Sequence, residues 1–83
     1  ACGPIAAEHF ADFAAFMQAL VRRYPSVRYW ELGNEPDVDP ALVAADSVFG
    51  CWGDKDAPDY GGAYYAAMLQ TVYPAIKQAN PQA

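Results

Sequence analysis

The residues best suited to chemistry lie within the segment 30–37, where a carboxyl group follows an amide and precedes a proline. Glu35 stands between Asn34 and the rigid Pro36. A carboxylic acid held in a partly dry pocket can protonate a leaving oxygen near neutral pH, and its carboxylate can later activate water. The amide of Asn34 can both donate and accept hydrogen bonds, which suits a substrate hydroxyl. The residue types therefore indicate Glu35 as a candidate proton donor and Asn34 as a candidate hydrogen-bonding residue.

Helical periodicity is found on both sides of this segment. Residues 7–24 carry apolar side chains at steps of three and four, which is the stripe of an amphipathic helix, and Pro25 should end it. Residues 60–78 repeat the pattern, with Asp59 as the expected cap and Pro74 as an expected kink. Two helices should therefore hold the candidate site between them.

Between the helices, residues 27–33 are rich in β-branched and aromatic side chains, and Gly and Pro bound them. This pattern predicts a strand covered on both faces, as in parallel α/β sheets. Residues 37–59 then read as a long loop, with a helical turn expected in 41–45. The predicted order is helix, strand, loop, helix, with Glu35 at the C-terminal end of a strand that needs partners from elsewhere.

A family resemblance rests on the triplet Asn34-Glu35-Pro36. It resembles the triplet that ends the fourth barrel strand of clan A glycoside hydrolases, and the branches most similar are family 39 and its relatives. The wider similarity covers Arg23-Tyr24, Val27, Tyr29-Trp30-Glu31, Gly33, Asp37, Tyr73-Pro74-Ala75-Ile76-Lys77 and Ala79-Asn80-Pro81. The fold it implies is α/β, a fragment of a (β/α)8 TIM barrel with helix 3, strand 4, a long βα loop and helix 4. Residues 1–83 would be part of a catalytic domain, completed by the remainder of the barrel.

The same resemblance implies a retaining glycosidase that cleaves O-glycosidic bonds of a carbohydrate substrate without metal or organic cofactor. Glu35 would be the general acid/base and Asn34 would hold the 2-hydroxyl of the sugar. The nucleophile would come from a strand outside this chain. Glu31 cannot replace it, because four residues of strand separate it from Glu35 by roughly 13 Å, whereas retaining chemistry needs carboxyl groups about 5 to 5.5 Å apart.

Trp52, in the long loop, has two open interpretations: its indole stacks on a sugar ring, or it covers the rim of the fold. The aspartates of this loop suggest calcium, but they lack EF-hand spacing and are better explained as surface carboxylates. A rival function is a noncatalytic carbohydrate-binding or interaction module, in which Trp52, Tyr60 and the acidic loop hold a ligand and Glu35 is incidental.

The two cysteines, Cys2 and Cys51, match no zinc or redox spacing. Free thiols and a disulfide are both open. In the implied barrel they would lie on adjacent loops of the active face, so we include a Cys2–Cys51 disulfide as a hypothesis. Such a bridge would indicate a secreted or periplasmic protein. Without it, the sequence does not indicate a location.

Composition narrows the remaining classes. The chain is 54% hydrophobic and 18% charged, which is typical of a globular protein rather than a disordered one. A net charge of -5 repels polyanions, so nucleic acid is not an expected partner. No stretch approaches the roughly 18 continuous apolar residues of a membrane span. We therefore expect neither nucleic acid nor membrane as a partner.

Overall fold

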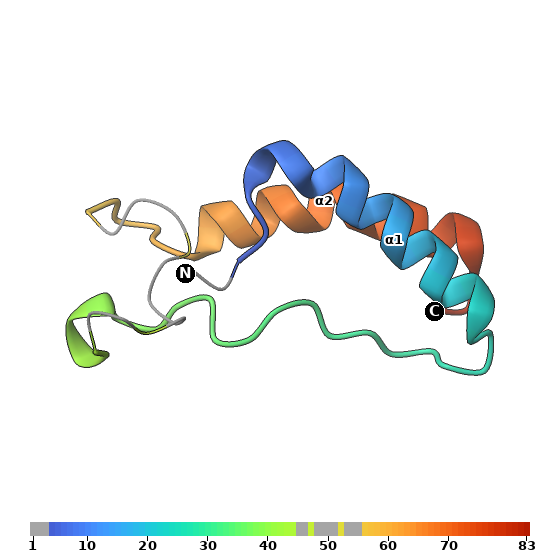
Figure 1. Cartoon of the computed structure of the whole chain (residues 1–83), viewed down its shortest axis with the longest axis horizontal. Coiled ribbons are helices and arrows are strands. Elements are labelled where there is room, and N and C mark those ends of the chain that lie inside the picture. Colours follow the sequence, from blue (N-terminus) through green and yellow to red (C-terminus); the bar gives the residue numbers. More distant parts are fainter. Residues whose placement is uncertain (1–3, 45–46, 48–51, 53–55) are drawn as a thin grey trace. The chain divides into compact units, whose positions relative to one another are not determined.

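The computed structural model describes residues 4–44, 47, 52 and 56–83 of the chain (Figure 1). They form two α-helices, α1 (Phe10–Arg23) and α2 (Gly62–Ala79), and two 3-10 turns, η1 (Ala7–His9) and η2 (Pro40–Leu42). These residues divide into two compact units. The loop unit contains Pro4 and the described part of Gly33–Ala67, and the helical unit contains Ile5–Leu32 and Met68–Ala83.

Helix α1 confirms the helix predicted over residues 7–24. One stripe at steps of four, three and four is buried, namely Phe10, Ala14, Met17 and Val21. Arg22 and Arg23 lie in the last turn, where positive charge suits the helix dipole. The backbone of Tyr24 is no longer helical, with φ −125° and ψ 66°. The following Pro25 disfavours the helical region for this residue.

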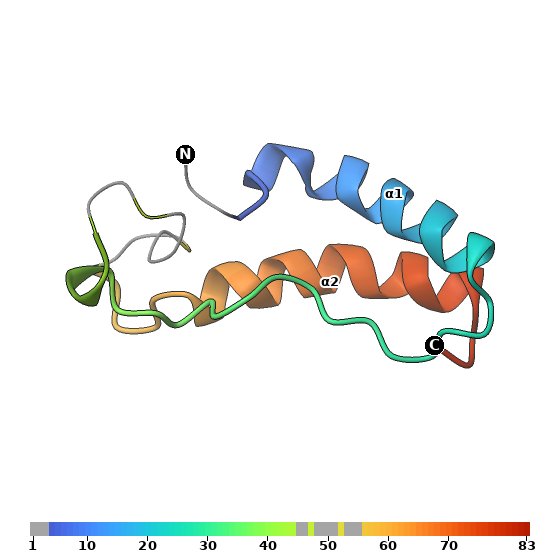
Figure 2. The same ribbon diagram turned by 60° about the horizontal axis from the view of Figure 1, so that its bottom comes forward.

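Helix α2 confirms the second predicted helix, and it continues through Pro74 without ending there. Its part in the helical unit buries residues at steps of four, Met68, Val72 and Ile76. This part of α2 runs alongside α1 in both ribbon views (Figures 1 and 2). Gln18 Nε2 of α1 donates to Gln78 Oε1 of α2 at 3.2 Å. The helical unit is therefore a pair of helices joined through apolar stripes.

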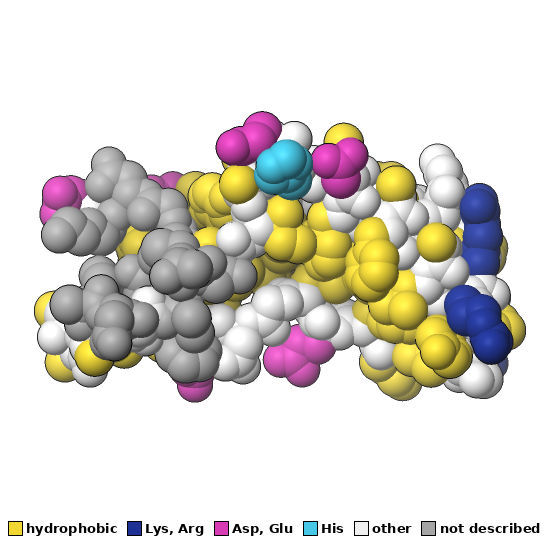
Figure 3. All heavy atoms as spheres, in the orientation of Figure 1, with side chains coloured by type: hydrophobic (Ala, Val, Ile, Leu, Met, Phe, Trp, Pro, Cys, Tyr) yellow, Lys and Arg dark blue, Asp and Glu magenta, His cyan; other side chains and the backbone are white. Residues whose placement is uncertain are grey.

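The turn after α1 is tied to the end of α2. Asn80 Nδ2 donates to the backbone carbonyl of Pro25 at 3.1 Å, and Asn80 Oδ1 accepts from the amide of Gln82 at 3.0 Å. Apolar side chains also remain on the surface of this unit, as the hydrophobic atoms in Figure 3 show. Among the exposed ones are Phe16, Tyr24 and Tyr73. The buried stripes thus use only part of the aromatic content of the two helices.

The predicted strand, and with it the α/β class and the TIM-barrel fragment, is wrong. Residues 27–32 run as an open coil, and no strand occurs in the part of the chain that the structure describes (Figure 2). The backbone N–H and C=O groups of residues 28–32 form no hydrogen bond with the backbone of any other described residue. Only Leu32 of this segment is buried, whereas Tyr29 is 93% exposed. A strand requires backbone hydrogen bonds to a neighbouring strand. This segment has β-branched and aromatic side chains but no partner strand among the described residues.

Amide hydrogen exchange tests this correction. We expect the amides of 28–32 to exchange at nearly unprotected rates, because they lack backbone partners. The amides of Met17 and Val72, which lie inside the buried helical stripes, should exchange much more slowly. NMR-detected exchange measures both sets in one sample. Protection of alternate amides within 28–32 would indicate a paired strand edge and contradict the all-helical description.

Candidate functional site

The Asn34-Glu35-Pro36 triplet forms a strained turn in the loop unit. Glu35 has a φ of 45°, and it is the one non-glycine residue with positive φ among those described. The amide of Val38 donates to the Glu35 carbonyl at 3.3 Å and closes the turn. A left-handed conformation costs about 1–2 kcal/mol for a residue with a side chain, so surrounding contacts must hold it. The side chains of Asn34 and Glu35 are exposed, so the partly dry pocket expected around Glu35 is not formed by the described residues.

Gly61 supplies a contact that fixes this turn. Gly61 is buried and has a φ of 78°. A Cβ atom at this position would lie 1.9 Å from the Pro36 carbonyl oxygen and 2.7 Å from its carbon. The backbone of Gly61 therefore packs directly on the residue that follows Glu35. Because Gly61 immediately precedes α2, the turn is seated against the start of that helix.

Trp52 belongs to the loop unit and is only 4% exposed. A Cβ atom on Gly33 would lie 2.6 Å from its Cη2 and 2.8 Å from its Cζ2, so the indole packs on the Gly33 backbone. Its ring meets Tyr64 at 6.2 Å between centroids and Tyr65 at 5.8 Å, both edge-on. This burial favours the packing interpretation of Trp52 over an open stacking platform, since little of the ring is left for a ligand.

The backbone of Trp52 extends the same network. Its amide donates to the hydroxyl of Tyr60 at 3.1 Å, and its carbonyl accepts from the amide of Gly61 at 3.2 Å. Trp52 thus connects Gly33, the residue before Asn34, with Tyr60 and Gly61, which directly precede α2. Its structural role is to hold Gly33, which precedes the candidate turn in sequence, and Gly61, which packs against Pro36 of that turn.

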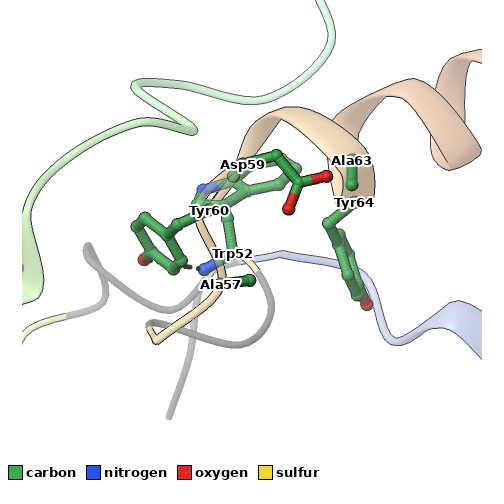
Figure 4. A pocket seen from close by; sticks show the side chains of 7 residues that line it. Trp52, Ala57, Asp59, Tyr60, Ala63 and Tyr64 are labelled. Carbon is green, nitrogen blue, oxygen red and sulfur yellow. Dashed lines mark hydrogen bonds between the residues drawn. The ribbon is translucent and has the colours of Figure 1, made fainter.

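A cavity of about 200 Å³ lies beside this network (Figure 4). Aromatic side chains, two alanines and one carboxylate surround it; the lining residues are Trp52, Ala57, Asp59, Tyr60, Gly61, Ala63 and Tyr64. Tyr60 and Tyr64 lie on opposite sides of Trp52 in Figure 4. We name it the Tyr60 cavity. The rival function predicted from the sequence names Trp52, Tyr60 and the acidic loop, to which Asp59 belongs, and these residues line the cavity. The contribution of Ala63 and Tyr64 from α2 was not predicted.

The remaining candidates are dispersed. Glu31 is exposed in the helical unit, and the acidic loop provides one cap, because Asp39 Oδ1 accepts from the amide of Ala41 at 2.8 Å. Within the described ranges, His, Cys, Asp and Glu side chains do not gather in threes as metal ligands would. Cys2 and Cys51 lie outside the described residues, so their disulfide and the location it implies stay predictions.

Comparisons with family models, with curated proteins and with solved structures found no match. Within the described part of the chain, neither helix is both long and apolar enough to cross a bilayer.

Proposed function

We propose that this chain carries the general acid/base of a retaining glycoside hydrolase, with Glu35 as that group and Asn34 as the residue that holds the 2-hydroxyl of the sugar. The observation that carries the proposal is the backbone of Glu35, the one described non-glycine residue with positive φ, in the triplet that resembles the glycosidase motif. Strained backbone concentrates at functional sites, where neighbouring contacts hold a side chain in a required direction. The Gly61–Pro36 contact provides such support.

The chemistry assigned to Glu35 has two steps. In the first, its carboxylic acid gives a proton to the glycosidic oxygen while a nucleophilic carboxylate attacks the anomeric carbon, so the C–O bond breaks and a glycosyl ester forms. In the second, the Glu35 carboxylate takes a proton from water, whose oxygen attacks the same carbon, so the ester bond breaks and the free sugar and the nucleophilic carboxylate are released. Two displacements at one carbon retain its configuration. We assign the nucleophile to a residue outside these 83 residues.

The exposure of Glu35 determines how the site must work. In the free chain this carboxyl group is in contact with water, which weakens its interaction with a substrate. Substrate binding would displace that water, and the proton would then be delivered in a drier environment. Asn34, exposed beside it, can donate and accept hydrogen bonds with sugar hydroxyls. Part of the binding energy of the sugar would thus be used to remove water from the Glu35 carboxyl group before it transfers its proton.

A noncatalytic carbohydrate-binding function is the second candidate, and the Tyr60 cavity favours it, because aromatic walls with a carboxylate suit a sugar without any reaction. Replacement of Glu35 separates the two. Loss of an acid/base slows the cleavage of glycosides with poor leaving groups, whereas an incidental surface carboxylate can be replaced without consequence for binding or for any activity of the protein.

The isolated chain is expected to hydrolyse no aryl glycoside above the buffer control, since the covalent path requires the absent nucleophile. A panel of nitrophenyl glycosides, followed by phenolate release, provides the measurement. A sample carrying Glu35→Gln controls for contaminating enzymes. Hydrolysis by the 83-residue chain that this substitution abolishes would contradict the assignment of the nucleophile to another part of the enzyme.

A further inference from the structure

We propose that the Tyr60 cavity is a subsite for one neutral sugar ring, adjacent to the bond on which Glu35 acts. This inference rests on the proposed function for its role in catalysis. The cavity is part of the loop unit, and each of its lining residues belongs to that unit. Its shape, polar groups and position each contribute to the assignment.

The walls of the cavity suit the two kinds of surface that a sugar ring presents. Its two tyrosine side chains, with Ala57 and Ala63, offer apolar contact to the C–H faces of a pyranose, while the buried Trp52 holds the wall behind them. The carboxylate of Asp59 is exposed and accepts no hydrogen bond from the described residues, so it can accept from sugar hydroxyls. The hydroxyl of Tyr60 accepts from the Trp52 amide and keeps its hydrogen for donation to a sugar oxygen.

The size and charge of the site limit its ligand. Pockets for drug-sized molecules enclose about 300–1,000 Å³. The Tyr60 cavity, at about 200 Å³, fits a single ring rather than an oligosaccharide. The Asp59 carboxylate and the net charge of -5 oppose an anionic ligand such as a uronic acid. A neutral monosaccharide unit is therefore the class that the cavity favours.

The contact between Gly61 and Pro36 links the cavity to the candidate acid/base. Gly61 lines the cavity and also touches the carbonyl of Pro36, the residue after Glu35. A sugar in the cavity would therefore lie next to the turn that carries the acid/base. One substrate could occupy the cavity with one ring and present the neighbouring glycosidic oxygen to Glu35.

The experiment uses the 83-residue chain and a panel of neutral monosaccharides, glucose, galactose, mannose and xylose, with glucuronate as the anionic counterpart of glucose. Amide NMR spectra report binding through the resonances of Gly61 and Ala63. We expect saturable shifts of these resonances with at least one neutral sugar, at a Kd on the order of millimolar. Glucuronate should bind at least several-fold more weakly than glucose. Absence of saturable shifts with every neutral sugar would overturn the subsite.

Two leucine substitutions provide a matched pair. Ala63 lines the cavity, whereas Ala66 is exposed on the same helix and does not line it. Ala63→Leu should fill the cavity and weaken binding at least tenfold, while Ala66→Leu should leave the Kd within twofold of the parent. Equal losses in both variants would overturn the proposal. Circular dichroism confirms that both remain helical.

The binding test separates the subsite from the proposed function. Glu35→Gln should leave the affinity of the chain for the monosaccharide within about twofold, because Glu35 does not line the cavity. Sugar binding that Ala63→Leu weakens supports the subsite even if Glu35 proves to have no acid/base role. An acid/base role for Glu35 without sugar binding at Gly61 and Ala63 would remove the subsite and leave the proposed function intact.

Discussion

Glu35→Gln, in the enzyme that carries this chain together with its nucleophile, is expected to lose roughly 10²- to 10⁴-fold in rate on glycosides with poor leaving groups. The substitution keeps the shape of the side chain while removing both the proton donor and the later base. An activated phenol leaves with little need of a proton, so the first step should survive for such substrates. The glycosyl ester would then accumulate, because water attacks slowly without a base. Burst kinetics of phenol release measure this difference between the two steps.

Asp37 provides the matched control for this variant. It is an exposed carboxylate two positions away, just after the proline of the same motif. Asp37→Asn should keep the rate within a few-fold for every leaving group, since Asp37 has no assigned role in proton transfer. Equal rate losses across leaving groups in Glu35→Gln would mean that Glu35 does not deliver the proton.

Gly61→Ala should be strongly disruptive, because two penalties coincide at this position. An alanine at a φ of 78° costs about 1–2 kcal/mol on conformational grounds. In addition, its Cβ atom would overlap the Pro36 carbonyl oxygen at 1.9 Å, and neither atom belongs to a flexible side chain. The backbone after Glu35 must therefore move away from α2. We expect the free energy of unfolding to fall by at least about 1 kcal/mol and the amide resonances of Asp37 and Val38 to shift.

Gly62→Ala is the neighbouring control. Gly62 begins α2, and a Cβ atom there meets no other atom within 4 Å. Alanine is favoured over glycine in helices, so stability should be unchanged or raised by up to about 1 kcal/mol. Denaturant titration and NMR spectra of both variants provide the comparison. If Gly61→Ala behaves like Gly62→Ala, the contact that seats the Glu35 turn against α2 does not exist.

The helices could be predicted from the sequence because their signal is local. Met17 and Val21 repeat at the helical period, and Pro25 marks the end of α1 without information from the rest of the chain. The second helix was equally clear, although it starts at Gly62 rather than at residue 60. The sequence Gly61-Gly62 before the apolar stripe does not indicate which of the two glycines takes the left-handed conformation. That depends on the distant Pro36, which lies against Gly61.

The coil conformation of the predicted strand segment could not be foreseen in the same way, because strand pairing is not a local property. Tyr29 and Trp30 have the side chains of a strand, yet the conformation requires a neighbour that accepts and donates backbone hydrogen bonds. The burial of Trp52 was equally hidden, since an indole in a loop gives no indication that Gly33 and Tyr64 will cover it. The candidate acid/base was found from its residue types, whereas the contact that holds its backbone became visible only in three dimensions.

The most direct test of the central claim is the product that Glu35→Gln forms from an activated glycoside in the presence of azide. Azide needs no base, so it should attack the accumulated ester and restore turnover. Proton NMR of the resulting glycosyl azide gives its anomeric configuration. If Glu35 is the acid/base of a retaining enzyme, the azide product keeps the configuration of the substrate. An inverted glycosyl azide would instead make Glu35 the nucleophile, and no azide product at all would remove it from the reaction.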